Sequence, residues 1–226
     1  MPISKDMPSL RLMKQDVDIK ICGMTREDDV ELALSLGANF LGFIVYPLSP
    51  RGITLERAVE LAASVPNGRA VIVDVETSAD DLLRYRDAGF DCFQIHASLP
   101  IAQKRLARWC EIVRRDRLWL APRVAPTDVF PESVLEYTDT VVLDTFSKDQ
   151  VGGTGHTGDF ERFASLKQQF EETQWMLAGG LSPSNVLDAL VRSTTSRIDV
   201  NSGVEIAPGI KDSEKLRELF RLVRGV

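Results

Sequence analysis

A cysteine stands at the end of the first predicted strand, in the stretch DIKICGMT (18–25). Lys20 precedes Cys22 by two residues and so lies on the same face of an extended strand, where its ammonium group favours the thiolate and lowers the thiol pKa. Gly23 then turns the chain sharply. Free cysteine is usually a small buried hydrophobe, so packing is the alternative. The setting favours a reactive thiol at Cys22.

An acidic residue occupies the matching position on a later strand. Asp144 ends the run TVVLD (140–144) and is followed by a loop rather than by a helix that it would cap. A partly desolvated carboxyl group can have a raised pKa and hold a proton to donate. The sequence therefore predicts a catalytic acid at Asp144. A base and an acid facing each other suit proton abstraction coupled to protonation elsewhere, as in aldose–ketose isomerisation.

Glycine clusters follow the last three predicted strands, as GGTG (152–155), AGGL (178–181) and NSGVE (201–205). A phosphate needs backbone N–H groups that approach closely, and side chains obstruct that approach. Any one cluster is compatible with a tight turn alone, but three in consecutive units favour a phosphate site. After the second cluster, Ser182 is expected to cap a helix with Pro183 at its first position.

Two further polar residues end predicted strands or follow them. Arg51 lies in the proline-containing loop PLSPRGIT, where a guanidinium group can bind a carboxylate in bidentate fashion or be a solvated loop arginine. His96 ends the run FQIH and either lines the substrate or is a buried histidine with satisfied hydrogen bonds. Cys92 and Cys110 are expected to be packing residues.

Short apolar runs alternate with amphipathic stretches along the chain, which predicts parallel strands joined by right-handed helical crossovers. The expected strands are 18–22, 40–45, 70–75, 92–96, 118–121, 140–144, 175–179 and 197–201. About eight helices are expected between them, the first over 26–37, where Gly37 follows its end. Eight units predict a single-domain (βα)₈ TIM barrel whose site lies at the C-terminal ends of the strands. An open doubly wound sheet is the alternative, and no GxGxxG follows the first strand to support it.

Composition narrows the class of protein. The chain has 226 residues and a net charge of −6 with mixed signs, unlike the basic footprint of a nucleic-acid-binding protein. The sequence has no run of about 18 apolar residues, so no membrane span is predicted. Three cysteines without CxxC spacing argue against disulfides and structural zinc and suit the cytoplasm. Residues 1–17 are expected to form an N-terminal leader and 18–226 the barrel, with a monomer as the default.

Several motifs, in the same order along the chain, resemble those of the phosphoribosylanthranilate isomerase family. They are KICGMT, GFIVYPLSPR, FQIH, VLDT with GGTG, LAGGLSPSNV and IDVNSGVEIAPGIKD. Together they cover the chain from about residue 18 to its end. KICG and the SGVE segment with its following PG.KD are the most specific.

The resemblance implies an Amadori rearrangement of N-(5-phosphoribosyl)anthranilate in tryptophan biosynthesis. Cys22 matches the family's general base, Asp144 its general acid and Arg51 the arginine that holds the anthranilate carboxylate. The implied partner is this phosphorylated small molecule, with no metal or organic cofactor. The expected substrate-binding residues are Arg51, His96, Gly153, Thr154, Gly155, Gly179, Gly180, Asn201, Ser202 and Gly203.

Two other functions remain open: another phosphosugar isomerase on the same barrel, and a non-catalytic barrel that binds a phosphorylated metabolite. An isomerase of the histidine pathway is less compatible, because that class typically has an aspartate where this chain has Cys22. The chain also departs from the family's common residues at Asp74, Ala121–Arg123, His156, Gly158 and Asn201.

Overall fold

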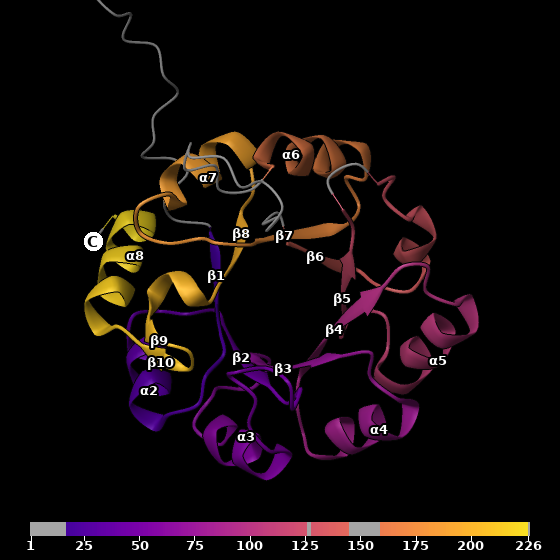
Figure 1. The fold of residues 1–226 in the computed structure, drawn as a ribbon, viewed down its shortest axis with the longest axis horizontal. Coiled ribbons are helices and arrows are strands. Elements are labelled where there is room, and N and C mark those ends of the chain that lie inside the picture. The colour runs from indigo at the N-terminus through magenta and orange to yellow at the C-terminus, as the bar shows by residue number, and fades with distance from the viewer. Residues whose placement is uncertain (1–16, 126–127, 145–158, 226) are drawn as a thin grey trace, which may run out of the picture.

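The protein is a closed barrel of eight parallel strands surrounded by helices (Figure 1). The computed structural model describes residues 17–125, 128–144 and 159–225. The barrel strands are β1 (Asp18–Cys22), β2 (Phe40–Ile44), β3 (Ala70–Val75), β4 (Cys92–Ser98), β5 (Leu118–Arg123), β6 (Thr140–Asp144), β7 (Gln174–Ala178) and β8 (Arg197–Val200).

Each strand pairs in parallel with the next one along the chain, and β1 closes the ring by pairing with β8. In that closing pair Lys20 lies opposite Asp199, and Ile19 lies opposite Ile198. The predicted (βα)₈ barrel is thereby confirmed, and the open doubly wound alternative is wrong because the sheet has no free edge.

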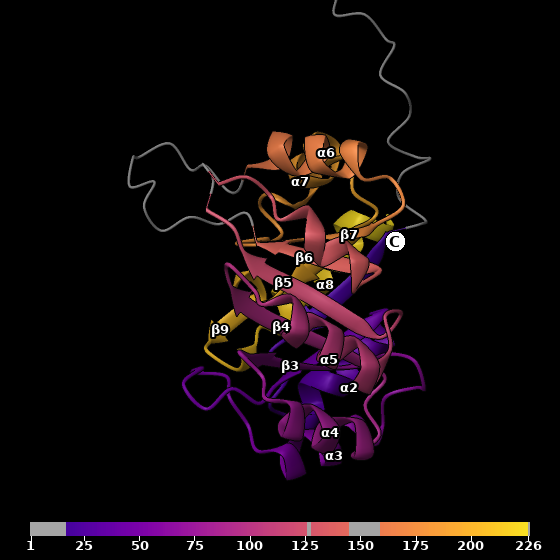
Figure 2. The same cartoon turned by 90° about the vertical axis from the view of Figure 1, so that its right-hand side faces the viewer.

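Seven α-helices lie outside the strands within the described ranges. They are α2 (Glu27–Ser35), α3 (Leu55–Ala62), α4 (Ala79–Asp87), α5 (Gln103–Val113), α6 (Phe160–Gln169), α7 (Val186–Ser193) and α8 (Ser213–Arg224). In the side view, α6 and α7 lie at one end of the picture and α3 and α4 at the other, with the strands between them (Figure 2). Gly37 and Gly89 follow α2 and α4 with φ of 91° and 92°, the left-handed conformation that glycine adopts readily.

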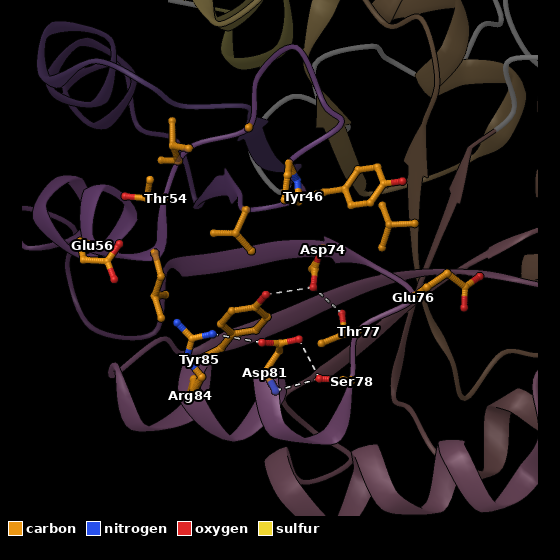
Figure 3. A pocket seen from close by; sticks show the side chains of 16 residues that line it. Tyr46, Thr54, Glu56, Asp74, Glu76, Thr77, Ser78, Asp81, Arg84 and Tyr85 are labelled. Atoms are coloured by element: carbon orange, nitrogen blue, oxygen red, sulfur yellow. Dashed lines mark hydrogen bonds and ion pairs between the residues drawn. The ribbon is translucent and has the colours of Figure 1, made fainter.

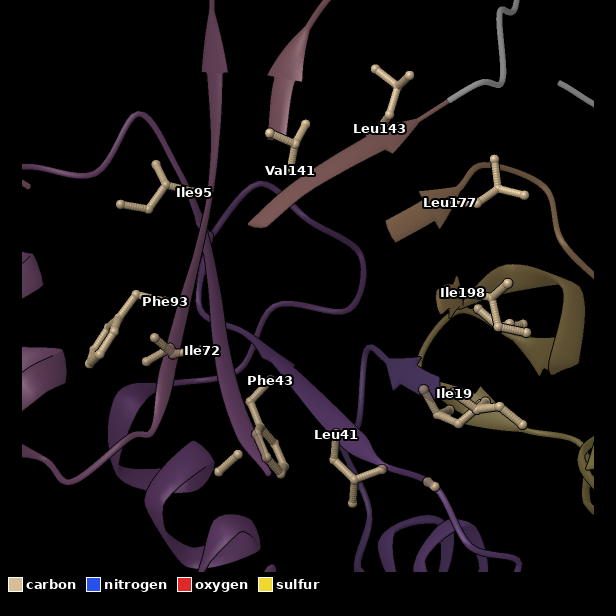
Figure 4. Packing of buried hydrophobic residues seen from close by; sticks show 14 of the residues in the cluster. Ile19, Leu41, Phe43, Ile72, Phe93, Ile95, Val141, Leu143, Leu177 and Ile198 are labelled. Atoms are coloured by element: carbon tan, nitrogen blue, oxygen red, sulfur yellow. The ribbon is translucent and has the colours of Figure 1, made fainter. Parts of the chain in front are cut away.

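Side chains alternate between two apolar layers along each strand. One layer packs between the strands and the helices and includes Ile72, Phe93 and Leu143, which Figure 4 shows among their neighbours. The other fills the barrel interior and includes Val71, Val73, Trp119 and Met176 together with Cys22. The alternation therefore directs Cys22 into the barrel, while Ile19 and Ile21 face the helices.

The structure differs from the predicted elements at several points. The described residues between β5 and β6 form a 3₁₀ helix, η1 (Glu132–Glu136), rather than an α-helix, because a proline-containing segment replaces the amphipathic pattern found elsewhere. β4 and β5 run on to Ser98 and Arg123, beyond their predicted ends. A hairpin of β9 (Glu205–Ala207) and β10 (Ile210–Lys211) follows the 3₁₀ helix η2 (Ser202–Val204), and it was not predicted.

None of the helices that the structure describes is long and apolar enough to cross a membrane.

Candidate active site

A cavity of about 270 Å³ opens at the C-terminal ends of the strands, and each of the eight strands or the segment directly after it contributes to its wall. Cys22 from β1 and Asp144 from β6 both line it. The strand order leaves only β7 and β8 between them along that arc of the ring. The thiol and the carboxyl group therefore share one compartment, as the sequence predicted.

Lys20 and Cys22 project into the barrel interior side by side. A Cβ atom on Gly42 of the neighbouring strand would lie 2.8 Å from Cys22 Sγ and 3.0 Å from Lys20 Nζ, so both groups border the space that the glycine leaves open. Lys20 Nζ also lies 2.9 Å from both carboxylate oxygens of Asp199, and its side chain is fully buried. The ammonium is thus held between a carboxylate and the thiol.

The balance of charge and burial at Cys22 differs from the sequence prediction. Burial raises the pKa of the Cys22 thiol; Lys20 lowers it, Asp199 raises it, and the net shift is upward. The expectation that Lys20 would leave a thiol of lowered pKa is therefore wrong, because desolvation outweighs the effect of the cation. For Lys20, burial acts to lower the pKa, but Asp199 and Cys22 outweigh it, so its pKa is raised and it stays charged.

Asp144 ends β6, and its side chain is exposed at the cavity rim. Its position opposite Ala178 of β7 places it beside the glycines that follow that strand. A carboxyl group at the rim can reach a substrate in the cavity and solvent as well, which suits a proton donor that must be recharged.

The glycine-rich turns after β7 and β8 form the wall between the two groups. Gly179, Gly180, Asn201 and Ser202 line the cavity. A Cβ on Gly203 would strike the backbone carbonyl oxygen of Leu181, so the two turns touch at a point where no side chain fits. The predicted contacts of Gly153, Thr154 and Gly155 lie outside the described residues.

The helix after β7 begins later than predicted. α7 starts at Val186 with Asn185 as its N-cap residue, rather than at Pro183 with Ser182 as cap. The side chain of Asn185 accepts a hydrogen bond from Ser182 N at 2.8 Å and donates one to Gly180 O at 2.9 Å. These two hydrogen bonds fix the turn that follows Gly179 and Gly180. They also favour a turn over a helix at Ser182–Asn185, because the side chain of Asn185 bonds the backbone there.

Arg51 is held by a carboxylate of the protein itself. Its Nε and Nη2 atoms donate to the two oxygens of Glu205 at 2.9 Å and 2.6 Å. Glu205 also accepts from the buried Lys211 Nζ at 2.9 Å, which lies 3.0 Å from Asn201 Oδ1. Ser49, from the same loop as Arg51, lines the cavity. Arg51 is therefore an anchored guanidinium group rather than a solvated one, and it is not among the described residues that line the cavity.

His96 lines the cavity, and so does Gln94 two residues before it on the same face of β4. The side chains meet at 3.0 Å between Gln94 Nε2 and His96 Nε2. Burial lowers the pKa of His96 to about 4, with a further lowering from Lys20. The imidazole is therefore neutral around pH 7.

Three buried polar residues that line the cavity were missed as site residues from the sequence: Gln94, Asp199 and Asp74. Gln94 and Asp199 stand two residues before His96 and Asn201, so the period of two along a strand was the signal that pointed to them. Asp74 was noted only as a departure from the family's common residue.

Asp74 lies in the wall between this cavity and a second one of about 730 Å³ that opens beside α3 and α4. Its Oδ2 atom accepts hydrogen bonds from Thr77 Oγ1 at 2.9 Å and Tyr85 OH at 3.0 Å, and Figure 3 shows these contacts from the side of the second cavity. The two bonds hold a buried carboxylate in a fixed orientation.

The sequence of this chain matches a known family. The family model described as N-(5'phosphoribosyl)anthranilate (PRA) isomerase matches residues 19–221. A relative of that name from Geobacter sp. is 37% identical over 205 residues, which cover 88% of this chain and 94% of the relative. Another, from a Synechococcus strain, is 34% identical and covers 89% of this chain and 94% of its own.

A solved structure shows the same fold. The crystal structure of a phosphoribosyl anthranilate isomerase in complex with reduced 1-(o-carboxyphenylamino)-1-deoxyribulose 5-phosphate superposes with a TM-score of 0.72 at 26% identity, covering 93% of this chain and all of that one. The chain belongs to the N-(5'-phosphoribosyl)anthranilate isomerase family.

Proposed function

We propose that this protein isomerises N-(5'-phosphoribosyl)anthranilate to 1-(2-carboxyphenylamino)-1-deoxyribulose 5-phosphate, a step of tryptophan biosynthesis. The observation that carries the proposal is the single cavity that both Cys22 and Asp144 line, with glycine-rich turns in the arc between them. The substrate is inferred from the family, and the acid–base chemistry is inferred from the residues that line the cavity.

In this reaction Asp144 is the general acid. It protonates the ring oxygen of the ribose, the bond between that oxygen and C1 breaks, and the anthranilate nitrogen and C1 form a protonated imine. Asp144 suits the role because it stands at the rim and can regain its proton from solvent.

Cys22 is the general base. Its thiolate takes the proton from C2, and the electron pair moves into the protonated imine to give an enolamine. Return of a proton to C1 and loss of the C2 hydroxyl proton then give the ketose, so atoms and charge balance without a redox partner. Because burial raises the thiol pKa, the fraction of thiolate, and with it kcat/KM, should continue to rise at pH values above the ordinary thiol pKa.

The remaining contacts bind the substrate. Backbone N–H groups around Gly180 and Ser202 hold the phosphate, and the anchored Arg51 holds the anthranilate carboxylate with the part of its guanidinium group that Glu205 leaves open. The barrel over 18–226 carries these groups, with residues 1–17 as a leader. The protein acts as a cytoplasmic monomer, in keeping with three free cysteines.

Fluorescence of freshly prepared substrate tests the proposal. The protein should deplete the substrate over many turnovers at concentrations far below the substrate's. Depletion that stops at one equivalent would identify a non-catalytic binder instead. No depletion, combined with turnover of a different phosphosugar, would identify another isomerase of the same fold.

A further inference from the structure

We propose that His96 donates a hydrogen bond from Nδ1–H, as a neutral imidazole, to an oxygen atom of the bound sugar, and that Gln94 is the positioning residue that keeps the proton on Nδ1. The proposal rests on the proposed function, since it assigns a role within the same cavity. His96 would then be a third side chain that contacts the reacting part of the substrate, beside Cys22 and Asp144.

The first step concerns the contact between the two side chains. Gln94 is 2% exposed, and its Nε2 atom lies 3.0 Å from His96 Nε2. An amide nitrogen can only donate a hydrogen bond, so the imidazole nitrogen that faces it must accept. The proton of a neutral imidazole is then on the other nitrogen, Nδ1.

The second step concerns the direction of that other nitrogen. Within the described part of the chain, Nδ1 of His96 has no hydrogen-bond partner. It is also not one of the polar atoms that are buried from solvent without a partner, so it borders accessible space. His96 itself is half-buried and lines the cavity. A hydrogen-bond donor is therefore left for whatever occupies the cavity.

The third step concerns Gln94. Its Oε1 atom is buried and has no partner among the described residues. A half-satisfied buried amide is unfavourable for stability, because the unpaired group has lost its hydrogen bonds to water. An apolar side chain of similar size would serve the barrel interior better, so the amide is explained by what it does to His96.

The fourth step concerns the charges that face the imidazole. They are the ion pair of Lys20 with Asp199 and Arg123 at the cavity rim. Burial, Lys20 and Arg123 lower the pKa of His96, Asp199 raises it, and the net result is a pKa of about 4. A neutral imidazole can hydrogen-bond the oxygen on C2 while that group changes from hydroxyl to carbonyl. It does not protonate the thiolate that removes the C2 hydrogen, as an imidazolium would.

Nitrogen NMR of ¹⁵N-histidine-labelled protein tests the tautomer. The chain has two histidines, and the His96 signals are those absent from the His96→Asn variant. We expect a protonated, pyrrole-type Nδ1 and an unprotonated, pyridine-type Nε2 between pH 5 and 8. A protonated Nε2 in the wild-type protein, or an imidazolium across this range, would overturn the proposal.

Two variants of Gln94 test the positioning role. Gln94→Glu replaces the donor with an acceptor, so the proton should move to Nε2 and kcat/KM should fall at least ten-fold. Gln94→Met removes the unsatisfied amide; its melting temperature should be unchanged or higher, yet kcat/KM should still fall because the tautomer is no longer fixed. Unaltered kcat/KM in Gln94→Glu, with the proton moved, would refute the role.

The two proposals fail separately in these measurements. A wild-type protein without turnover of the anthranilate substrate would overturn the proposed function, while the NMR result would still decide which nitrogen carries the proton. Normal wild-type turnover with undiminished kcat/KM in His96→Asn would overturn this inference alone.

Discussion

Removing the buried ammonium of Lys20 should destabilise the barrel far more than removing any surface charge. The Lys20→Met variant keeps the length and apolar character of the stem but leaves Asp199 without the partner that lies 2.9 Å from both of its oxygens. The two side chains are 0% and 7% exposed, so little water can replace the lost contact. Breaking a buried pair in this way costs about 3–5 kcal/mol of unfolding free energy.

Urea unfolding followed by tryptophan fluorescence measures this loss. The double variant Lys20→Met with Asp199→Leu removes both charges and should recover most of the stability, because two apolar side chains leave nothing uncompensated. Glu161→Gln is the matched control: it disrupts the exposed pair with Arg192 and should leave the unfolding free energy nearly unchanged. A single variant as stable as the control, or a double variant as unstable as the single one, would refute the reasoning.

Three further outcomes follow from the site. Arg51→Ala should raise KM by an amount equivalent to about 1.5–3 kcal/mol, since a charge-assisted pair with the substrate carboxylate is lost, and an unchanged KM in steady-state kinetics would contradict this. Gly203→Ala should weaken binding of inorganic phosphate measured by calorimetry, because its Cβ would strike Leu181 O and force the two turns apart; phosphate affinity equal to the wild type would count against the cradle. The pKa of His96 is about 4 in the folded protein and about 6.5 when unfolded, so the unfolded chain binds more protons between these values and stability should rise with pH there, by up to about 3 kcal/mol. Urea titrations at several pH values should show a steeper rise of stability with pH in the wild type than in His96→Asn.

The barrel could be predicted because its signals are local. Short runs rich in β-branched residues mark β1, β3 and β6 to the residue, and Gly37 and Gly89 mark where helices end. The segment between β5 and β6 lacks the amphipathic period, and its described residues form the 3₁₀ helix η1. The helix start predicted at Ser182 was wrong. Serine followed by proline is a common helix start, but here the side chain of Asn185 bonds Ser182 N and stabilises a turn before the helix begins.

The site was harder to predict from the sequence, because its chemistry depends on burial and on contacts between residues far apart in the sequence. Lys20 and Asp199 are 179 positions apart, and only the closed ring brings them together. The pKa of Cys22 moved opposite to the prediction because desolvation cannot be judged from neighbouring residues. Likewise, the sequence marked Arg51 as a site residue but could not show that Glu205 anchors it.

The division of work between Asp144 and Cys22 can be tested most directly by trapping the imine with cyanoborohydride. Cys22→Ala should still open the ribose ring, so it should accumulate the reduced open-chain amine faster than buffer alone, without forming the ketose. Asp144→Asn should give no more trapped amine than buffer. Ketose formation at a near-normal rate by Cys22→Ala, or enzyme-dependent trapping in Asp144→Asn, would contradict the assignment of base and acid.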